Sequence, residues 1–251
     1  MPKNDSKLWG HLTDTWGIGE RVIPQMMVDD PLNQDILKIS FQRYEIASGF
    51  VVGKRVLDIA CGTGYGSQIL AKAGAITTIG VDVCEETIEY ARHHYLSPNL
   101  EFICADAEQY TESEPFDVIC SFETIEHLRD PEGFLQNVDQ LLAPQGYLIL
   151  SVPLGETRHI DPYHLHKFTQ QSICSLVEAA GFFIELYRSD PFRMTRSDLI
   201  RIRQIYPSAQ PSWSDLFQTK RGWHSLFDIV FKGGFFIPQF MLVARKRESR
   251  R

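Results

Sequence analysis

Short apolar runs alternate with segments of helical spacing along the first three quarters of the chain. The runs cover residues 55–60, 76–82, 101–106, 116–122 and 146–153. Runs that are apolar throughout are typical of strands buried on both faces of a parallel sheet. Helical spacing appears between them at 65–73, 85–95 and 131–142, and the last segment follows Asp130, an N-cap, with Pro131 at its first position. Repeated strand–helix–strand units predict an α/β, doubly wound sheet with a ligand site at the carboxyl ends of its strands.

The size of the chain suits one domain with additions. It has 251 residues, of which 43% are apolar, enough for one substantial core. No apolar stretch reaches the length of a membrane helix, and the first residues lack the apolar core of a secretory signal. The five cysteines are odd in number and have no CxxC spacing, so we expect free thiols in a reducing cytoplasm.

A glycine-rich turn follows the first predicted strand. Residues 56–66 read VLDIACGTGYG, which places Gly62 and Gly64 just after Asp58. Glycine allows a backbone to approach a ligand without a Cβ in the way, so this turn predicts a cofactor cradle. The motif alone is weak evidence, because glycine turns also serve plain strand-to-helix connections.

Two acids at the ends of the next strands narrow the choice of cofactor. Asp82 lies where an acid accepts hydrogen bonds from ribose hydroxyls, and Asp106 ends the third strand. An acidic residue that binds ribose hydroxyls is compatible with both a nicotinamide and an adenosyl cofactor. However, the dinucleotide pattern requires glycine where this chain has Ser67, and Asp58 suits a cationic ligand better than a pyrophosphate.

Five segments then follow in order: VLDIACGTG, VDVCEETIEYAR, ICADAEQ, FDVICSFETIEHLRDPEGFL and LLAPQGYLILSVP. In order and spacing they resemble the successive motifs of the class I S-adenosylmethionine-dependent methyltransferases over residues 54–189. The resemblance implies a Rossmann-like, seven-stranded sheet whose last strand is antiparallel. We assign the sixth strand to residues 182–188 and the seventh to residues 239–246.

The same resemblance divides the chain into four parts. These are an N-terminal helical extension (1–53), the cofactor-binding core (54–189), an insertion between strands six and seven (190–238), and the last strand with a basic tail (239–251). The insertion carries Trp213, Phe217, Trp223, Phe227, Phe231, Phe235 and Phe236. We expect it to form either a lid over a bulky acceptor or a homodimer surface.

Carried over residue by residue, the resemblance implies a binding site for S-adenosyl-L-methionine. The residues that match are Asp58, Ala60, Gly62, Gly64, Asp82, Val83, Asp106, Ala107 and Phe122. Asp58 would lie near the methionine amino group, and Asp82 would accept the ribose hydroxyls. Val83 would pack on the adenine, whose amino edge Asp106 and Ala107 would contact. Ala60 departs from members that have glycine there, although alanine is also frequent.

The residues after the fourth strand, SFETIEH, would face the transferred methyl group. A hydroxyl or ammonium acceptor must lose a proton, and His127 is the candidate base because imidazole titrates near neutrality. Glu126 would orient His127 or bind a substrate amine. The alternatives are a histidine that only packs at a helix start and an acid that is merely exposed.

A second polar cluster, RHIDPYHLHKFT, occupies residues 158–169. Loops at this place in the fold contact substrates, so we expect acceptor contacts from Tyr163, His164 and His166. Arg43 and Tyr44 of the N-terminal extension would close over the cofactor or the acceptor. The alternatives are a loop that only caps the following helix and an extension helix that only packs on the sheet.

A metal site is a further expectation. The related small-RNA 3′-terminal 2′-O-methyltransferases carry Glu-x-x-Glu-His after strand four and a histidine before an aromatic-Thr stretch, and these residues hold magnesium. Glu123, Glu126, His127 and His166, or His164 in its place, match that pattern here. Such a set could bind Mg²⁺ and orient a vicinal diol. The alternative is that ETIEH works without a metal.

The sequence therefore predicts a cytoplasmic methyltransferase that acts on oxygen or nitrogen of a small molecule, a sugar or a secondary metabolite. One alternative is a metal-dependent RNA 2′-O-methyltransferase, the only case with a nucleic-acid partner. The other is a non-catalytic protein that binds the adenosyl cofactor and assists a partner. No membrane partner is expected.

Overall fold

The computed structural model describes residues 22–26, 31–155, 163–195, 227, 231 and 234–247. Its elements in chain order are η1 (Pro24–Met26), α3 (Pro31–Ser48), β1 (Arg55–Ile59), α4 (Tyr65–Lys72), β2 (Thr77–Asp82), α5 (Glu85–His94), β3 (Leu100–Cys104), β4 (Phe116–Phe122), η2 (Ile125–His127), α6 (Pro131–Leu141), β5 (Leu142–Pro153), α7 (Gln170–Ala179), β6 (Phe182–Thr195) and β7 (Gly234–Lys246).

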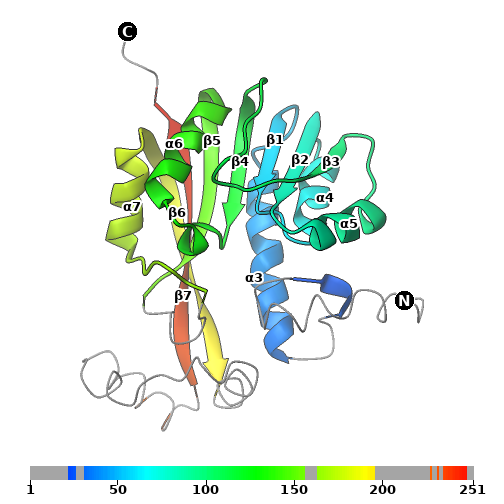
Figure 1. The fold of residues 1–251 in the computed structure, drawn as a ribbon. Coiled ribbons are helices and arrows are strands. Elements are labelled where there is room, and N and C mark those ends of the chain that lie inside the picture. The colour runs from blue at the N-terminus through cyan, green and yellow to red at the C-terminus, as the bar shows by residue number, and fades with distance from the viewer. Residues whose placement is uncertain are drawn as a thin grey trace.

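Within these residues the strands form a seven-stranded sheet in the order β3-β2-β1-β4-β5-β7-β6 (Figure 1). Its strands pair in parallel except β7, which is antiparallel to both β5 and β6. The predicted doubly wound α/β sheet with an antiparallel last strand is confirmed. The strand order reverses between β1 and β4, which makes their carboxyl ends the expected ligand site.

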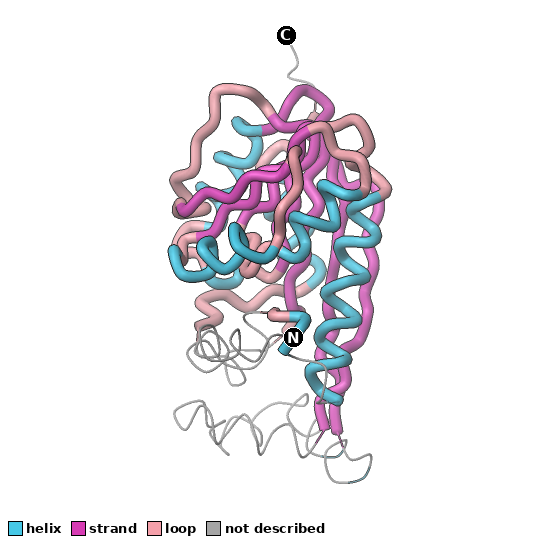
Figure 2. The backbone as a smooth tube through the Cα atoms, turned by 90° about the vertical axis from the view of Figure 1, so that its right-hand side faces the viewer, coloured by secondary structure: helices cyan, strands magenta, loops and turns pink. Residues whose placement is uncertain are grey.

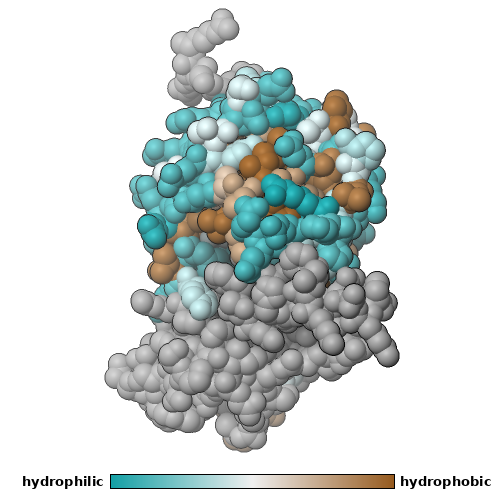
Figure 3. All heavy atoms as spheres, turned by 45° about the vertical axis from the view of Figure 1, so that its right-hand side comes forward, coloured by the Kyte–Doolittle hydropathy of each residue, from teal (hydrophilic) through white to brown (hydrophobic). Residues whose placement is uncertain are grey.

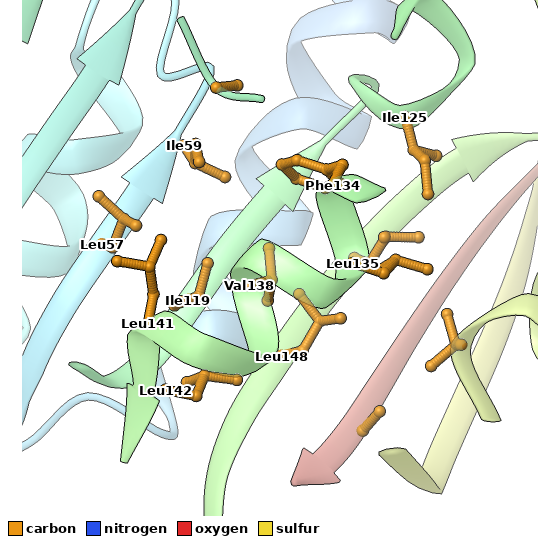
Figure 4. Packing of buried hydrophobic residues seen from close by; sticks show 14 of the residues in the cluster. Leu57, Ile59, Ile119, Ile125, Phe134, Leu135, Val138, Leu141, Leu142 and Leu148 are labelled. Atoms are coloured by element: carbon orange, nitrogen blue, oxygen red, sulfur yellow. The ribbon is translucent and has the colours of Figure 1, made fainter. Parts of the chain in front are cut away.

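Helices cover both faces of the sheet. On one face, Phe134 and Val138 of α6 belong with Leu57 of β1 to the largest buried cluster among the described residues (Figure 4). On the other face, Tyr44 of α3 joins a cluster that includes Val56 of β1. Neighbouring residues of a strand point to opposite faces, so β1 contributes to both layers.

The cap of α6 forms as its sequence predicts. Oδ1 of Asp130 accepts a hydrogen bond from the backbone N–H of Gly133 at 2.9 Å, and Pro131 occupies the first helical position. This arrangement satisfies one of the N–H groups that a helix start leaves unpaired.

The last two strands are longer than predicted. β6 and β7 pair from Phe182↔Lys246 as far as Thr195↔Gly234, so both ends of the predicted 190–238 insertion belong to the sheet. Asp190 and Pro191 interrupt the apolar pattern of β6, which is why the sequence suggested an earlier end. The division into four parts stays a prediction, and most of the insertion, including Trp213 and Trp223, lies outside the described residues. Phe227 and Phe231 are exposed, with ring centroids 4.6 Å apart.

Helix α3 of the N-terminal extension packs against α4 and runs beside strands β6 and β7 (Figure 2). The ring of Tyr44 lies directly over Gly66 at the start of α4, where an added Cβ would come within 1.8 Å of the ring. The same ring makes an edge contact with Phe122 at a centroid distance of 4.9 Å. Gly66 is therefore required by helix packing.

Small groups of hydrophobic side chains reach the surface among hydrophilic ones (Figure 3). Scattered apolar side chains are normal on a folded domain. None of the helices in the described ranges combines the length and apolar content that crossing a membrane requires.

We expect Gly66→Ala to lower the free energy of unfolding by about 1–3 kcal/mol, because its methyl group would overlap the ring of Tyr44. Urea unfolding measures the difference. In a Tyr44→Ala background the ring is absent, so the same change should cost less. An equal cost in both backgrounds would contradict this packing.

Candidate functional site

A cleft of about 770 Å³ opens at the carboxyl ends of the parallel strands. Twelve of the predicted site residues line it: Arg43, Tyr44, Ala60, Gly62, Asp82, Val83, Asp106, Ala107, Phe122, Glu123, His127 and Tyr163. Five predicted residues do not line it: Asp58, Gly64, Glu126, His164 and His166. The volume is in the range of ligand sites in enzymes.

Backbone strain marks the two strand ends on either side of the switch point. Ala60, after β1, has φ 60°, and Glu123, after β4, has φ 49°. L-residues other than glycine rarely adopt this left-handed conformation, and such strain concentrates at functional sites. Both turns carry the chain away from the sheet at the cleft.

The two predicted cofactor glycines have different reasons to be glycine. Gly62 has φ 56°, lines the cleft, and has no atom within 4 Å of an added Cβ. Gly64 has φ 85°, and an added Cβ would lie 2.6 Å from the ring of Phe102. Gly62 therefore leaves space for a ligand, whereas Gly64 allows the loop to pack on the protein.

Asp82 organises the turn of this loop. Its Oδ2 accepts a hydrogen bond from the N–H of Gly62 at 3.0 Å, and its Oδ1 accepts one from the N–H of Cys84 at 3.0 Å. Each carboxylate oxygen has capacity for a further bond. Asp82 thus holds the glycine turn and can also accept donors from a ligand in the cleft.

The next part of the wall is apolar with a polar edge. Val83 is 68% exposed although it lies in the cleft wall, so it offers an uncovered apolar surface. Asp106 follows β3, and its Oδ1 accepts a hydrogen bond from the N–H of Glu108 at 2.9 Å. Ala107 lines the cleft beside it. A flat apolar ring with a polar rim fits this arrangement.

Asp58 lies behind the cleft and is 1% exposed. Its Oδ2 accepts hydrogen bonds from Ser67 Oγ at 2.6 Å and from the Tyr44 hydroxyl at 3.2 Å. Burial raises the pKa of Asp58 to about 7, and the hydrogen bonds from Ser67 and Tyr44 oppose that shift. The sequence predicted that Asp58 lies beside a ligand. Asp58 lies two residues after Val56 in β1, so its side chain points to the same face of the sheet, toward α3 and α4.

Arg43 and Glu123 form an ion pair in the wall of the cleft. Arg43 Nη2 lies 3.1 Å from Glu123 Oε1, and it also donates a hydrogen bond to Gln239 Oε1 at 2.8 Å. Glu123 Oε1 accepts a further hydrogen bond from Ser151 Oγ at 2.8 Å. This network joins α3 to the ends of β4 and β5 and to the middle of β7.

His127 reaches the cleft from η2. Its Nδ1 lies 3.3 Å from the carbonyl oxygen of Tyr163, and its Nε2 lies 4.0 Å from Oε1 of the buried Glu126. A carbonyl oxygen only accepts, so Nδ1 carries the hydrogen and Nε2 is left as the basic atom. Glu126 does not line the cleft, so it can act only through His127.

The predicted metal ligands are brought together only in part. Glu123 is held by Arg43 and Ser151, while His166 Nε2 donates to the carbonyl oxygen of Leu128 at 2.8 Å. Among the described residues, Glu126, His127 and His164 bring one ligand atom each within 4.8 Å of one another. These three are predicted ligands in the form of the set that uses His164, whereas Glu123 and His166 are bonded to other groups, so a metal site stays a prediction.

The predicted acceptor contacts are only partly in place. Tyr163 lines the cleft and is 47% exposed, while His164 is buried and packs edge-on against His127 at a centroid distance of 4.7 Å. Tyr44 borders the cleft, but its hydroxyl is committed to Asp58.

Sequence reasoning missed further lining residues: Val22, Ser40, Cys61, Thr63, Tyr65, Glu108, Gln109, Thr124, Leu128, Arg129 and Leu165. Most of them adjoin a predicted residue, so closeness in sequence was an available signal. Val22 and Ser40 come from the N-terminal extension and carry no such signal.

A family model described as a methyltransferase domain matches residues 37–186. The chain is similar to the ubiquinone biosynthesis O-methyltransferase of Coxiella burnetii, with 41% identity over 102 residues, which cover 39% of this chain and 43% of that protein. The match thus spans less than half the length of that relative.

Two solved structures share the fold. The cyclase SpnF has a TM-score of 0.64 and 18% identity, covering 98% of this chain and 94% of its own. The N-methyltransferase NodS from Bradyrhizobium japonicum, in complex with S-adenosyl-L-homocysteine, has a TM-score of 0.58 and 17% identity, covering 90% and 92%. At these identities the likeness concerns the fold alone.

The raised pKa of Asp58 predicts a loss of stability with rising pH. The folded state binds the proton more tightly than the unfolded chain, whose aspartates titrate near pH ~3.9. The contribution is complete below that pH and is lost as pH rises through about 7, by at most about 4 kcal/mol. Urea unfolding from pH ~4.5 to ~8 measures the free energy of unfolding of the protein and of Asp58→Asn. The excess stability of the protein over the variant should shrink or reverse toward high pH. Parallel profiles would refute the assignment.

Proposed function

Because the chain belongs to the class I S-adenosylmethionine-dependent methyltransferases, we propose that it methylates a hydroxyl oxygen of a small molecule with His127 as the base. The observation that carries this proposal is His127 itself, whose Nδ1 is hydrogen-bonded to the backbone in the cleft beside a buried carboxylate. The O-methyltransferase of Coxiella burnetii supports an oxygen acceptor.

We place the adenosyl part of the cofactor along the ends of β1, β2 and β3. Gly62 leaves open space where a Cβ would stand, and Val83 offers an apolar surface for the adenine. Asp82 would accept the ribose hydroxyls, and Asp106 with Ala107 would meet the adenine edge. These features fit S-adenosyl-L-methionine.

We place the methionyl end toward Arg43. A guanidinium has five N–H donors, and the two described contacts both use Nη2. Its charge suits the carboxylate of the cofactor, while Glu123 holds the guanidinium in position and offers negative charge near the amino group. This assigns to Glu123 the role near the amino group that the sequence gave to Asp58.

The acceptor would lie between His127 and the loop after β5. Tyr163 is 47% exposed and Leu165 is 51% exposed, and Leu128 lines the same cleft, so this end is largely apolar. An apolar ring or chain that carries a hydroxyl fits such a wall better than a phosphodiester chain. A small-molecule acceptor is therefore favoured over RNA.

The chemistry that these residues supply is positioning and proton removal. When bound, S-adenosyl-L-methionine provides a methyl group activated by its sulfonium. His127 Nε2 would take the acceptor proton, and the carboxylate of Glu126 at 4.0 Å would stabilise the imidazolium that forms. Holding the acceptor oxygen in line with the methyl group contributes about 7–11 kcal/mol in well-oriented reactions.

The alternatives gain less support. The magnesium-dependent RNA hypothesis used Glu123, Glu126 and His127 with His164 or His166, and of these Glu123 and His166 are bonded to other groups. A non-catalytic cofactor-binding partner would not need a histidine and a buried carboxylate in contact at the strand end.

We also propose that the protein acts in the cytoplasm. Its five cysteines are free, which suits a reducing compartment.

Replacing the base gives the main test. We expect His127→Asn to lower kcat by about 10²–10⁴-fold, because the acceptor proton has no base, with the dissociation constant of the cofactor unchanged. Turnover with a panel of hydroxylated acceptors and calorimetry with S-adenosyl-L-homocysteine measure the two quantities. His93→Asn is the control, because His93 is exposed on α5, where its Nδ1 lies 2.7 Å from the carbonyl oxygen of Glu89, and it does not line the cleft. Normal turnover by His127→Asn would end the proposal.

We also expect chelation to leave turnover intact, since Glu123 and His166 are engaged in bonds within the protein. The protein is treated with EDTA, exchanged into metal-free buffer and assayed with and without added Mg²⁺, Mn²⁺ or Zn²⁺. Loss of activity that one ion restores would favour a metal at Glu126, His127 and His164 instead.

A further inference from the structure

The loop after β5 is bound tightly to η2, the element that carries the base. Four hydrogen bonds join them: Leu165 N–H to Glu126 O at 2.8 Å, His166 N–H to Glu126 O at 3.1 Å, His166 Nε2 to Leu128 O at 2.8 Å, and His127 Nδ1 to Tyr163 O at 3.3 Å. Three of these bonds use backbone carbonyl groups of η2 or of the residue that follows it. The position of η2 is therefore set by this loop.

The same loop is also fixed to the sheet. Phe168 forms an isolated bridge with Leu154 at the end of β5, and its carbonyl oxygen accepts a hydrogen bond from Gly155 N–H at 2.8 Å. Phe168 is buried in the main core. The loop that holds η2 is therefore itself held by the sheet and the core through Phe168.

His166 has a special place in this arrangement. Its backbone N–H binds the carbonyl oxygen of Glu126 and its ring binds that of Leu128, so it spans the two neighbours of His127. Because a carbonyl oxygen only accepts, the His166 ring carries its hydrogen on Nε2. His166 itself does not line the cleft.

We propose that His166 is a positioning residue that fixes the orientation and the Nδ1–H form of His127. By holding both flanking carbonyl groups, it keeps His127 Nδ1 against the carbonyl oxygen of Tyr163 and the ring against His164. The groups that face His127 are then Glu126, His164 and the Tyr163 carbonyl, and Nε2 is the one ring atom that can accept a proton. This inference rests on the proposed role of His127 as base.

Two variants of His166 separate the ring bond from bulk and polarity. The amide nitrogen of His166→Gln lies near the place of Nε2 and can still donate to the Leu128 carbonyl, whereas the shorter side chain of His166→Asn cannot reach it. We expect His166→Asn to lower kcat by roughly 10- to 100-fold with the cofactor dissociation constant and KM nearly unchanged, and His166→Gln to restore most of the loss. His94→Asn is the matched control, since His94 Nδ1 bonds a backbone carbonyl on α5 at 2.8 Å.

The second measurement is independent of turnover. Nitrogen NMR of the imidazole rings, with His127 assigned from His127→Asn, should show a single Nδ1–H form in the protein and in His166→Gln, and a mixture of the two tautomers in His166→Asn. An unchanged His127 signal together with unchanged kcat in His166→Asn would overturn the inference, and so would equal losses in the Gln and Asn variants. If His127→Asn stays active while the His127 tautomer of the unmodified protein still changes in His166→Asn, the function proposed above fails and the positioning role stands.

Discussion

The bond between the Tyr44 hydroxyl and the Asp58 carboxylate holds the N-terminal helix against the first strand. It is buried, and Ser67 of α4 contributes a second donor to the same carboxylate. A buried carboxylate without such donors would be strongly destabilising. Moving α3 away from β1 would remove the Tyr44 donor, so this hydrogen bond keeps the helix and the strand together. Because α3 is fixed here, Arg43, one position before Tyr44, meets Glu123 in the wall of the cleft.

The fold could be predicted because its signals are local and repeated. Strand β1 places apolar side chains on both faces, Leu57 and Ile59 on one and Val56 on the other, and Asp130 with Pro131 predicts a helix start. The sheet order and the antiparallel β7 came only from the resemblance. No local pattern marks β6 beyond Asp190 and Pro191, where the pairing with β7 continues against propensity.

The candidate site was predictable at the strand ends and less so behind them. Asp82, Val83 and Asp106 line the cleft because they lie at the carboxyl ends of parallel strands near the switch point, where ligand sites form. Asp58 and Gly66 serve contacts with Tyr44, which is distant in sequence, and no single-sequence pattern reveals such a partner. Likewise, the spacing of Glu123 and His166 suggested metal ligands, yet each is bound by a neighbour that spacing does not show.

The network around Arg43 also bears on how the molecule is assembled during synthesis. The bond from Arg43 to Gln239 joins residues 196 positions apart. A domain generally folds as a unit, and a contact of such separation can form only after the ribosome has released both of its residues. The wall that we assign to the methionyl end is therefore completed only when the final strand has emerged, so a nascent chain that already holds the glycine turn of Gly62 would still lack the brace that Gln239 gives to Arg43.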